Sequence, residues 1–363
     1  MQAPANLKPL TALRFFAAMW VVLYHYWPNL NAAATPALVE KGYLGVELFF
    51  TLSGFILCHV YLASVADGGF RYGPFLWARL ARVYPLHLAT LVGVGLMALA
   101  ATAAGRSIDA NVLSWPSLPA NLLLLHAWGF APAAGWNHPS WSISAEWFAY
   151  LTFPAFAWAA LKLRERPWVA AGLALGFLTI LYALFERLTG QLLTHATIAW
   201  GALRIVPCFA WGCATYLVWR SGAVHGHKVA ISGAVISGAA VLALGQIGAP
   251  DAAIVAMFGG LILSLAALSS ANKTGPVEAT LVYLGEISYS IYMICIPWKL
   301  LFVNFCSQVF GLDKAHLPVV VWIVYVLSLI PLAAASHAAI EVPARLFLRD
   351  GWKRPRRVLT SVA

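Results

Sequence analysis

The sequence predicts an all-α polytopic integral membrane protein, with about ten transmembrane helices and one short re-entrant or interfacial helix. Three observations lead to this prediction. Hydrophobic residues make up 61% of the 363 residues and charged residues only 10%, whereas soluble domains carry about 25% charged residues. The mean hydropathy of the chain is +0.78. The apolar stretches are close to the roughly 20 residues that a helix needs to cross a bilayer, and longer than the ~10-residue alternating strands of a membrane β-barrel.

Ten apolar stretches are long enough to be transmembrane spans. The N-terminus is basic and lacks a small-residue cleavage site, so we expect no cleavable signal peptide. A further stretch, residues 118–131, is too short to cross and is expected to be re-entrant or interfacial. We expect one membrane domain over residues 1–345 and a basic cytoplasmic tail over 346–363. The expected spans are residues 8–28, 43–62, 76–104, 139–161, 167–186, 196–219, 228–247, 252–270, 280–303 and 317–340.

The distribution of basic residues predicts the orientation of these spans. With the N-terminus in the cytoplasm, 17 of the 23 Lys and Arg residues fall on the inner side, and the other six, Arg204 among them, on the outer side. This asymmetry follows the positive-inside rule, so we expect both termini to be cytoplasmic. The net charge of +10 then faces anionic membrane lipids, and no nucleic-acid partner is needed to explain it.

The five cysteines lie in apolar stretches and lack the paired spacing of a metal site. We therefore expect core thiols, with no disulfide and no metal. The residues are Cys58, Cys208, Cys213, Cys295 and Cys306.

The first span contains two ionisable residues, Arg14 and His25. A charged group at membrane depth costs roughly 2.5–3.5 kcal/mol on insertion scales and is usually kept for function. Eleven helical residues place the two about 16 Å apart along the axis and about 20° apart around it, so they share one face. The simpler alternatives are that Arg14 extends to the membrane surface and that His25 is an interfacial histidine among aromatic residues.

Topology sorts the other polar residues into two layers. The second and fourth spans run inward, so Glu47 and Glu146, near their starts, are expected at the outer level with His25. The third span runs outward, which leaves Arg79 and Arg82 at the inner level with the arginine of the first span. The arginines could instead be positive-inside anchors, and either carboxylate could be a structural partner.

The residues of each layer suit a different chemical task. Guanidinium groups bind phosphates through paired hydrogen bonds and stay charged, so three of them suit a polyanion. A neutral histidine beside a carboxylate suits general base catalysis on a hydroxyl. A coenzyme A thioester has a polyanionic nucleotide and a long, mostly uncharged arm, which matches two layers separated by about 16 Å.

Five segments in order along the chain resemble the acyltransferase-3 family, the membrane O-acyltransferases that modify bacterial surface carbohydrates. The resemblance covers almost the whole chain, and the order of the blocks is more specific than any one block. The segments are the Arg14-x10-His25 spacing and residues 45–55, 79–85, 141–146 and 284–297.

The resemblance implies transfer of an acyl group, with acetyl expected, from cytoplasmic acyl-CoA to a carbohydrate hydroxyl, in a bacterial inner membrane. His25 would be the general base, assisted by Glu146 and less directly by Glu47, and a covalent acyl-histidine remains an alternative. The residues expected to bind acetyl-CoA are Arg14, Arg79 and Arg82, and those expected to bind substrate are Trp141, Ser144 and Tyr289.

Cys295 stands where many members of this family have a histidine, so no catalytic role is expected there. The sequence also shows no extra extracytoplasmic domain, so the acceptor is expected to dock on the membrane domain itself. Homo-oligomers are compatible with the sequence but nothing in it specifies one.

Two other classes of function remain open. A transporter of a lipid-linked sugar or organic anion could use the same arginines and histidine, although no internal repeat is evident. A non-catalytic scaffold would leave the intramembrane charges without a role.

Overall fold

The computed structural model describes residues 7–105, 112–269 and 275–353, and within these ranges the chain is helical with no strand, as expected. Four helices are short: α2 (Ala37–Glu40), α5 (Leu118–Leu122), α11 (Pro276–Glu286) and the last helix, α14 (Val342–Lys353). The long helices are α1 (Lys8–Tyr26), α3 (Gly45–Ala66), α4 (Tyr72–Ala103), α6 (Trp141–Lys162), α7 (Pro167–Thr189), α8 (Gly201–Arg220), α9 (His227–Gln246), α10 (Asp251–Ala267), α12 (Ser288–Phe310) and α13 (Val319–Ser336).

Each expected span contains a helix, but the number of ten crossings is not confirmed. Seven helices in the described ranges are long and apolar enough to cross a membrane. The ninth expected span is two helices, α11 and α12, which meet at Ile287. The 118–131 stretch forms only the short α5 followed by turns. At the C-terminus, α14 runs across the expected domain boundary at 345, and residues 354–363 of the expected tail lie outside the described residues.

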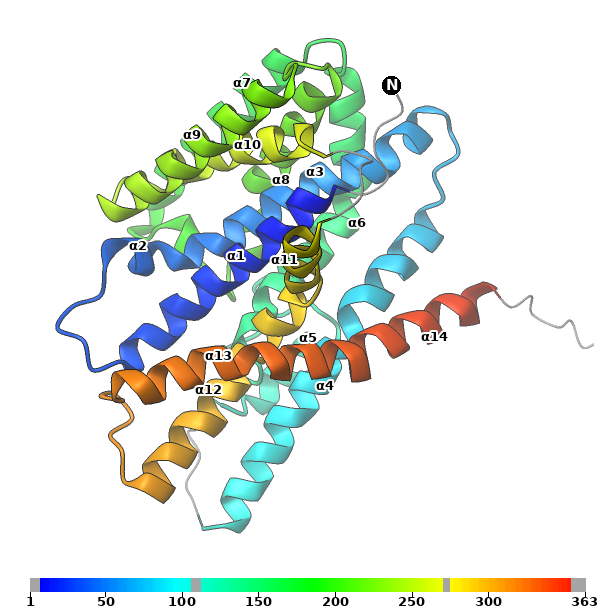
Figure 1. Cartoon of the computed structure of the whole chain (residues 1–363). Helices are drawn as coiled ribbons and strands as arrows, with labels where there is room; N and C mark the ends of the chain where they lie inside the picture. Colours follow the sequence, from blue (N-terminus) through cyan, green and yellow to red (C-terminus); the bar gives the residue numbers. More distant parts are fainter. Residues whose placement is uncertain (1–6, 106–111, 270–274, 354–363) are drawn as a thin grey trace, which may run out of the picture.

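Buried side chains form two clusters, and α1 belongs to both. The larger cluster joins α1 to α3, α6, α7, α8 and α10, and contains Leu10 and Leu13. The smaller joins α1 to α12 and α13, and contains Val22 and Tyr26. Figure 1 accordingly shows α1 (dark blue) crossing the middle of the molecule, between α3 and α8 on one side and α12 and α13 on the other. The helix that carries Arg14 and His25 therefore lies between the two clusters.

A close helix crossing joins α3 to α8 through two glycines. A Cβ on Gly54 would collide with the backbone oxygen of Phe209, and one on Gly212 would collide with that of Thr51. Small residues allow such close approach of helices in membranes, where dispersion contacts supply much of the packing energy. This crossing fixes α3, which carries Glu47 and Ser53, against α8.

Replacing Gly212 with Ala is expected to destabilise the protein by about 1–3 kcal/mol, because the added methyl group forces the two backbones apart. The matched control is Gly172→Ala on α7, where a Cβ would meet nothing within 4 Å. The thermal unfolding midpoint in detergent measures both. Equal midpoints for the two variants would contradict a close-packed crossing.

Candidate functional site

A cavity of about 260 Å³ lies between α1, α3, α4, α6 and α12. Its polar lining contains the three arginines that the sequence grouped together, and its apolar lining comes mostly from α3. The arginines and the carboxylate that line it are Arg14, Arg79, Arg82 and Glu146. The prediction that the three arginines lie close together is therefore confirmed.

The guanidinium groups are largely available to a ligand. In the described part of the chain, neither Arg14 nor Arg82 forms a hydrogen bond or an ion pair with a protein group. Arg79 donates one weak hydrogen bond to the hydroxyl of Tyr61, at 3.3 Å, and lies over the same ring. Its buried Nε has no hydrogen-bond partner among the described residues. Buried donors without partners are rare, so these groups indicate a site for an anionic ligand.

Glu146 lies in this arginine cavity, and the expectation that it sits beside His25 is wrong. Its Oε1 accepts a hydrogen bond of 2.7 Å from Ser53, and Arg14 is an electrostatic neighbour. The physical reason is the starting depth of α6. The preceding 3₁₀ turn, His138–Ser140, has Pro139 and Ser140 buried against α12, so the helix starts well inside the protein.

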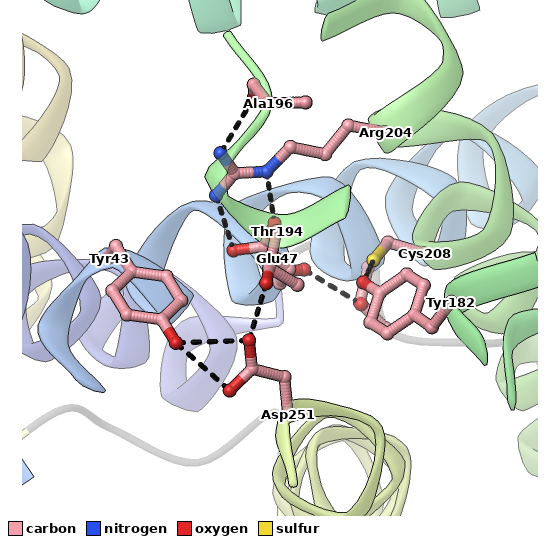
Figure 2. A network of polar contacts seen from close by, with 9 residues as sticks. Tyr43, Glu47, Tyr182, Thr194, Ala196, Arg204, Cys208 and Asp251 are labelled. Carbon is pink, nitrogen blue, oxygen red and sulfur yellow. Dashed lines mark hydrogen bonds and ion pairs between the residues drawn. The ribbon is translucent and has the colours of Figure 1, made fainter. Parts of the chain in front are cut away.

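Glu47 does not lie beside His25 either. Both of its oxygens accept hydrogen bonds from Arg204, and the two side chains are 0% and 2% exposed (Figure 2). Glu47 is therefore the partner of a buried guanidinium group, and it is not among the electrostatic neighbours of His25. Arg204 lies in the first turn of α8, within the expected span 196–219.

Around this ion pair is a wider polar network, shown in Figure 2. Asp251 accepts hydrogen bonds from Thr194, from Lys41 at 2.6 Å and from Tyr43 at 3.0 Å. Arg204 also donates to the carbonyl oxygen of Ala196, at 2.9 Å. The network joins the starts of α3, α8 and α10 and has a structural role.

His25 has basic neighbours, and among the described residues no carboxylate pairs with it. Its titratable neighbours are His138 and Lys299, and Lys299 Nζ donates a 2.7 Å hydrogen bond to the carbonyl oxygen of His25. The ring of Tyr24 contacts the imidazole edge-on, with centroids 5.1 Å apart. Burial lowers the pKa of His138, which favours the neutral form of this neighbour. His25 does not line the arginine cavity.

The three residues expected to bind substrate have different positions. Tyr289 lines the cavity, and its hydroxyl donates to the carbonyl oxygen of Val83 at 2.5 Å. Ser144 is fully buried, and its hydroxyl bonds to the backbone of Leu124, which ties the 118–131 segment to α6. Trp141 lies under Arg204, with the guanidinium carbon 4.5 Å from the ring centroid. Only Tyr289 of the three reaches the cavity.

Sequence reasoning missed Glu341, a buried carboxylate in the π-turn after α13. Its Oε2 accepts a 3.2 Å hydrogen bond from Ser290 and pairs with Nδ1 of His337 at 3.0 Å. Arg14 is an electrostatic neighbour. An acidic residue at the end of the last apolar stretch was the available signal, and π-turns are frequent near functional sites.

The chain was compared with known proteins. The model of a family described as "Acyltransferase domain" (Acyl_transf_3) matches residues 8–337. The chain is 32% identical to "Acyltransferase MdmB" of Streptomyces mycarofaciens over 317 residues, which cover 80% of this chain and 78% of that protein. It is 40% identical to "Protein 2 in picA locus" of Rhizobium radiobacter over 88 residues, 24% of this chain and 44% of that protein. No solved structure matches the chain significantly.

Proposed function

This chain belongs to the Acyl_transf_3 family of membrane acyltransferases, and from that premise we propose that it transfers an acyl group, acetyl in the simplest case, from acyl-CoA to a carbohydrate hydroxyl. The acceptor would be a cell-surface or lipid-linked carbohydrate. The observation that carries the proposal is the cavity lined by three arginines whose donors are mostly unused by the protein.

Binding of the donor would depend on charge. The phosphates of coenzyme A carry several negative charges, and the cavity lining presents three guanidinium groups against one carboxylate, Glu146. Arginine binds phosphate through paired, charge-assisted hydrogen bonds. The apolar side chains of α3 on the other wall suit the mostly uncharged pantetheine arm. Glu146, hydrogen-bonded to Ser53, would help to orient Arg14.

The chemistry would take place at His25. The neutral imidazole accepts the proton of the acceptor hydroxyl while the oxygen attacks the thioester carbonyl, and the proton then passes to the leaving thiolate of coenzyme A. The ester forms as the carbon–sulfur bond breaks, so atoms and charge balance without a metal. We assign no carboxylate to His25, because Glu47 and Glu146 are bound elsewhere.

The orientation of the protein in the membrane would give the arginines and His25 access to different sides. We propose an inner bacterial membrane with both termini in the cytoplasm, which the distribution of Lys and Arg supports. The arginine end of the cavity would then face cytoplasmic acyl-CoA and His25 would face the outer side. Mass spectrometry of surface glycans with and without the gene would identify donor and acceptor together.

Replacing Arg14 with Ala is expected to weaken the binding of acetyl-CoA by about 10- to 100-fold, because one or two charge-assisted hydrogen bonds to phosphate are lost. Titration calorimetry of the purified protein measures the affinity. The matched control is Arg187→Ala, an exposed arginine of α7 that does not line the cavity. Unchanged affinity in Arg14→Ala would remove the donor site from this cavity.

A further inference from the structure

Helix α12 is hydrogen-bonded to other segments at several positions along its length, from the arginines to His25. Tyr289 bonds to Val83, next to Arg82, and Tyr292 donates a 3.0 Å hydrogen bond to the carbonyl oxygen of Pro139. Further along, Lys299 bonds to the carbonyl oxygen of His25. Ten residues of helix span about 15 Å, so α12 runs beside the whole path that an acyl donor would follow.

The carbonyl group of Pro139 is bonded to side chains of the cavity wall. Two hydroxyl groups that line the cavity, those of Tyr292 and Ser142, both donate hydrogen bonds to this oxygen, at 3.0 and 3.2 Å. The preceding residue, His138, is one of the two titratable neighbours of His25. The peptide chain at residues 138–139 therefore connects the wall of the arginine cavity to the surroundings of His25.

A second hydrogen bond holds the same segment to α12. Nδ2 of Asn137 donates to the carbonyl oxygen of Met293 at 2.8 Å, and Asn137 is only 1% exposed. Its Oδ1 has no hydrogen-bond partner among the described residues. A buried acceptor that is left unsatisfied favours another arrangement of the segment in which it finds a donor.

We infer that residues Asn137–Ser140 form a gate between the arginine cavity and His25. The gate is held closed by the hydrogen bonds Tyr292–Pro139 and Asn137–Met293, and it opens for the thioester end of the donor. That last step rests on the proposed function. The closed gate keeps ions from crossing the membrane through the protein. It also protects the thioester from hydrolysis, in which water adds across the carbon–sulfur bond to give a carboxylate, a proton and the thiol of coenzyme A.

The test uses the full-length protein in liposomes and two variants, Tyr292→Phe and Asn137→Ala, each of which removes one closing hydrogen bond. The first readout is proton leak, measured with a pH-sensitive dye trapped inside. The second is the hydrolysis of acetyl-CoA without an acceptor. Loss of one neutral hydrogen bond shifts an open–closed equilibrium by about fivefold, so each variant is expected to raise both rates by about that factor.

The matched control is Tyr26→Phe. The Tyr26 hydroxyl is also buried and donates to a carbonyl of α12, that of Cys295 at 2.7 Å, but it joins α12 to α1 and not to the gate. Both rates are expected to stay at the wild-type value in this variant, with unfolding midpoints measured for all three. Wild-type proton leak in both gate variants would overturn the gate. Absence of acetyl-CoA turnover in the wild type, with every acceptor tried, would instead reject the proposed function. The proton-leak measurement would still test the gate in that case.

Discussion

Replacing His25 with Asn is expected to lower the turnover of acyl transfer by at least about 100-fold, the smaller end of what general base catalysis contributes. Asparagine keeps the size and polarity of the side chain but cannot take up a proton. The affinity for acetyl-CoA should be unchanged, because His25 does not line the arginine cavity. Steady-state transfer of labelled acetyl, together with calorimetric titration of acetyl-CoA, measures the two effects separately.

A control for this variant is His227→Asn, an exposed histidine at the start of α9. It should leave both turnover and affinity at the wild-type value. If His25→Asn kept wild-type turnover, the base would have to be another group. His138, a half-buried electrostatic neighbour of His25, would be the next candidate.

Replacing Arg204 with Met is expected to destabilise the protein by about 3–5 kcal/mol, because it leaves Glu47 as an uncompensated charge in a fully buried position. Glu47→Met should be destabilising to a similar degree, since it leaves the guanidinium alone. The unfolding midpoint in detergent, followed by tryptophan fluorescence, measures both. Midpoints equal to the wild type would mean that water or lipid headgroups reach the pair.

The double variant Glu47→Met/Arg204→Met separates a structural role from a catalytic one. Replacing both members of a buried ion pair by apolar residues is often far less costly than removing one. The double variant should therefore be more stable than either single variant and should retain acyl transfer. A stable but inactive double variant would return Glu47 to the catalytic site, where the sequence had placed it.

The helices and the meeting of the three arginines were predictable for general reasons. A hydrocarbon environment demands long apolar helices, so the spans are visible as apolar stretches. Because successive spans run in opposite directions, Arg14 near the start of one outward span and Arg79 near the start of another are placed at the same depth. This argument needs only the order and direction of the spans.

Estimating the depth of a single residue by counting from the end of a span was less reliable. The count assumed that each helix begins at the membrane surface, but α6 begins inside the protein, after a turn whose Pro139 is bonded to α12. Glu146 therefore lies one level deeper than expected, with Arg14. A local sequence does not reveal where its first turn is anchored.

By itself, the sequence determined the helical membrane architecture, the family, and the residues that carry charge into the protein, since each of these follows from composition, span length or ordered motifs. Only the tertiary structure decided which partner each carboxylate has. Glu47 pairs with Arg204, 157 residues away, Glu146 joins the arginines, and His25 lies outside the arginine cavity. The physical reason is that a buried charge pairs with the group that packing brings within hydrogen-bond distance. The spacing of residues along one helix does not predict how that helix packs against helices distant in the sequence.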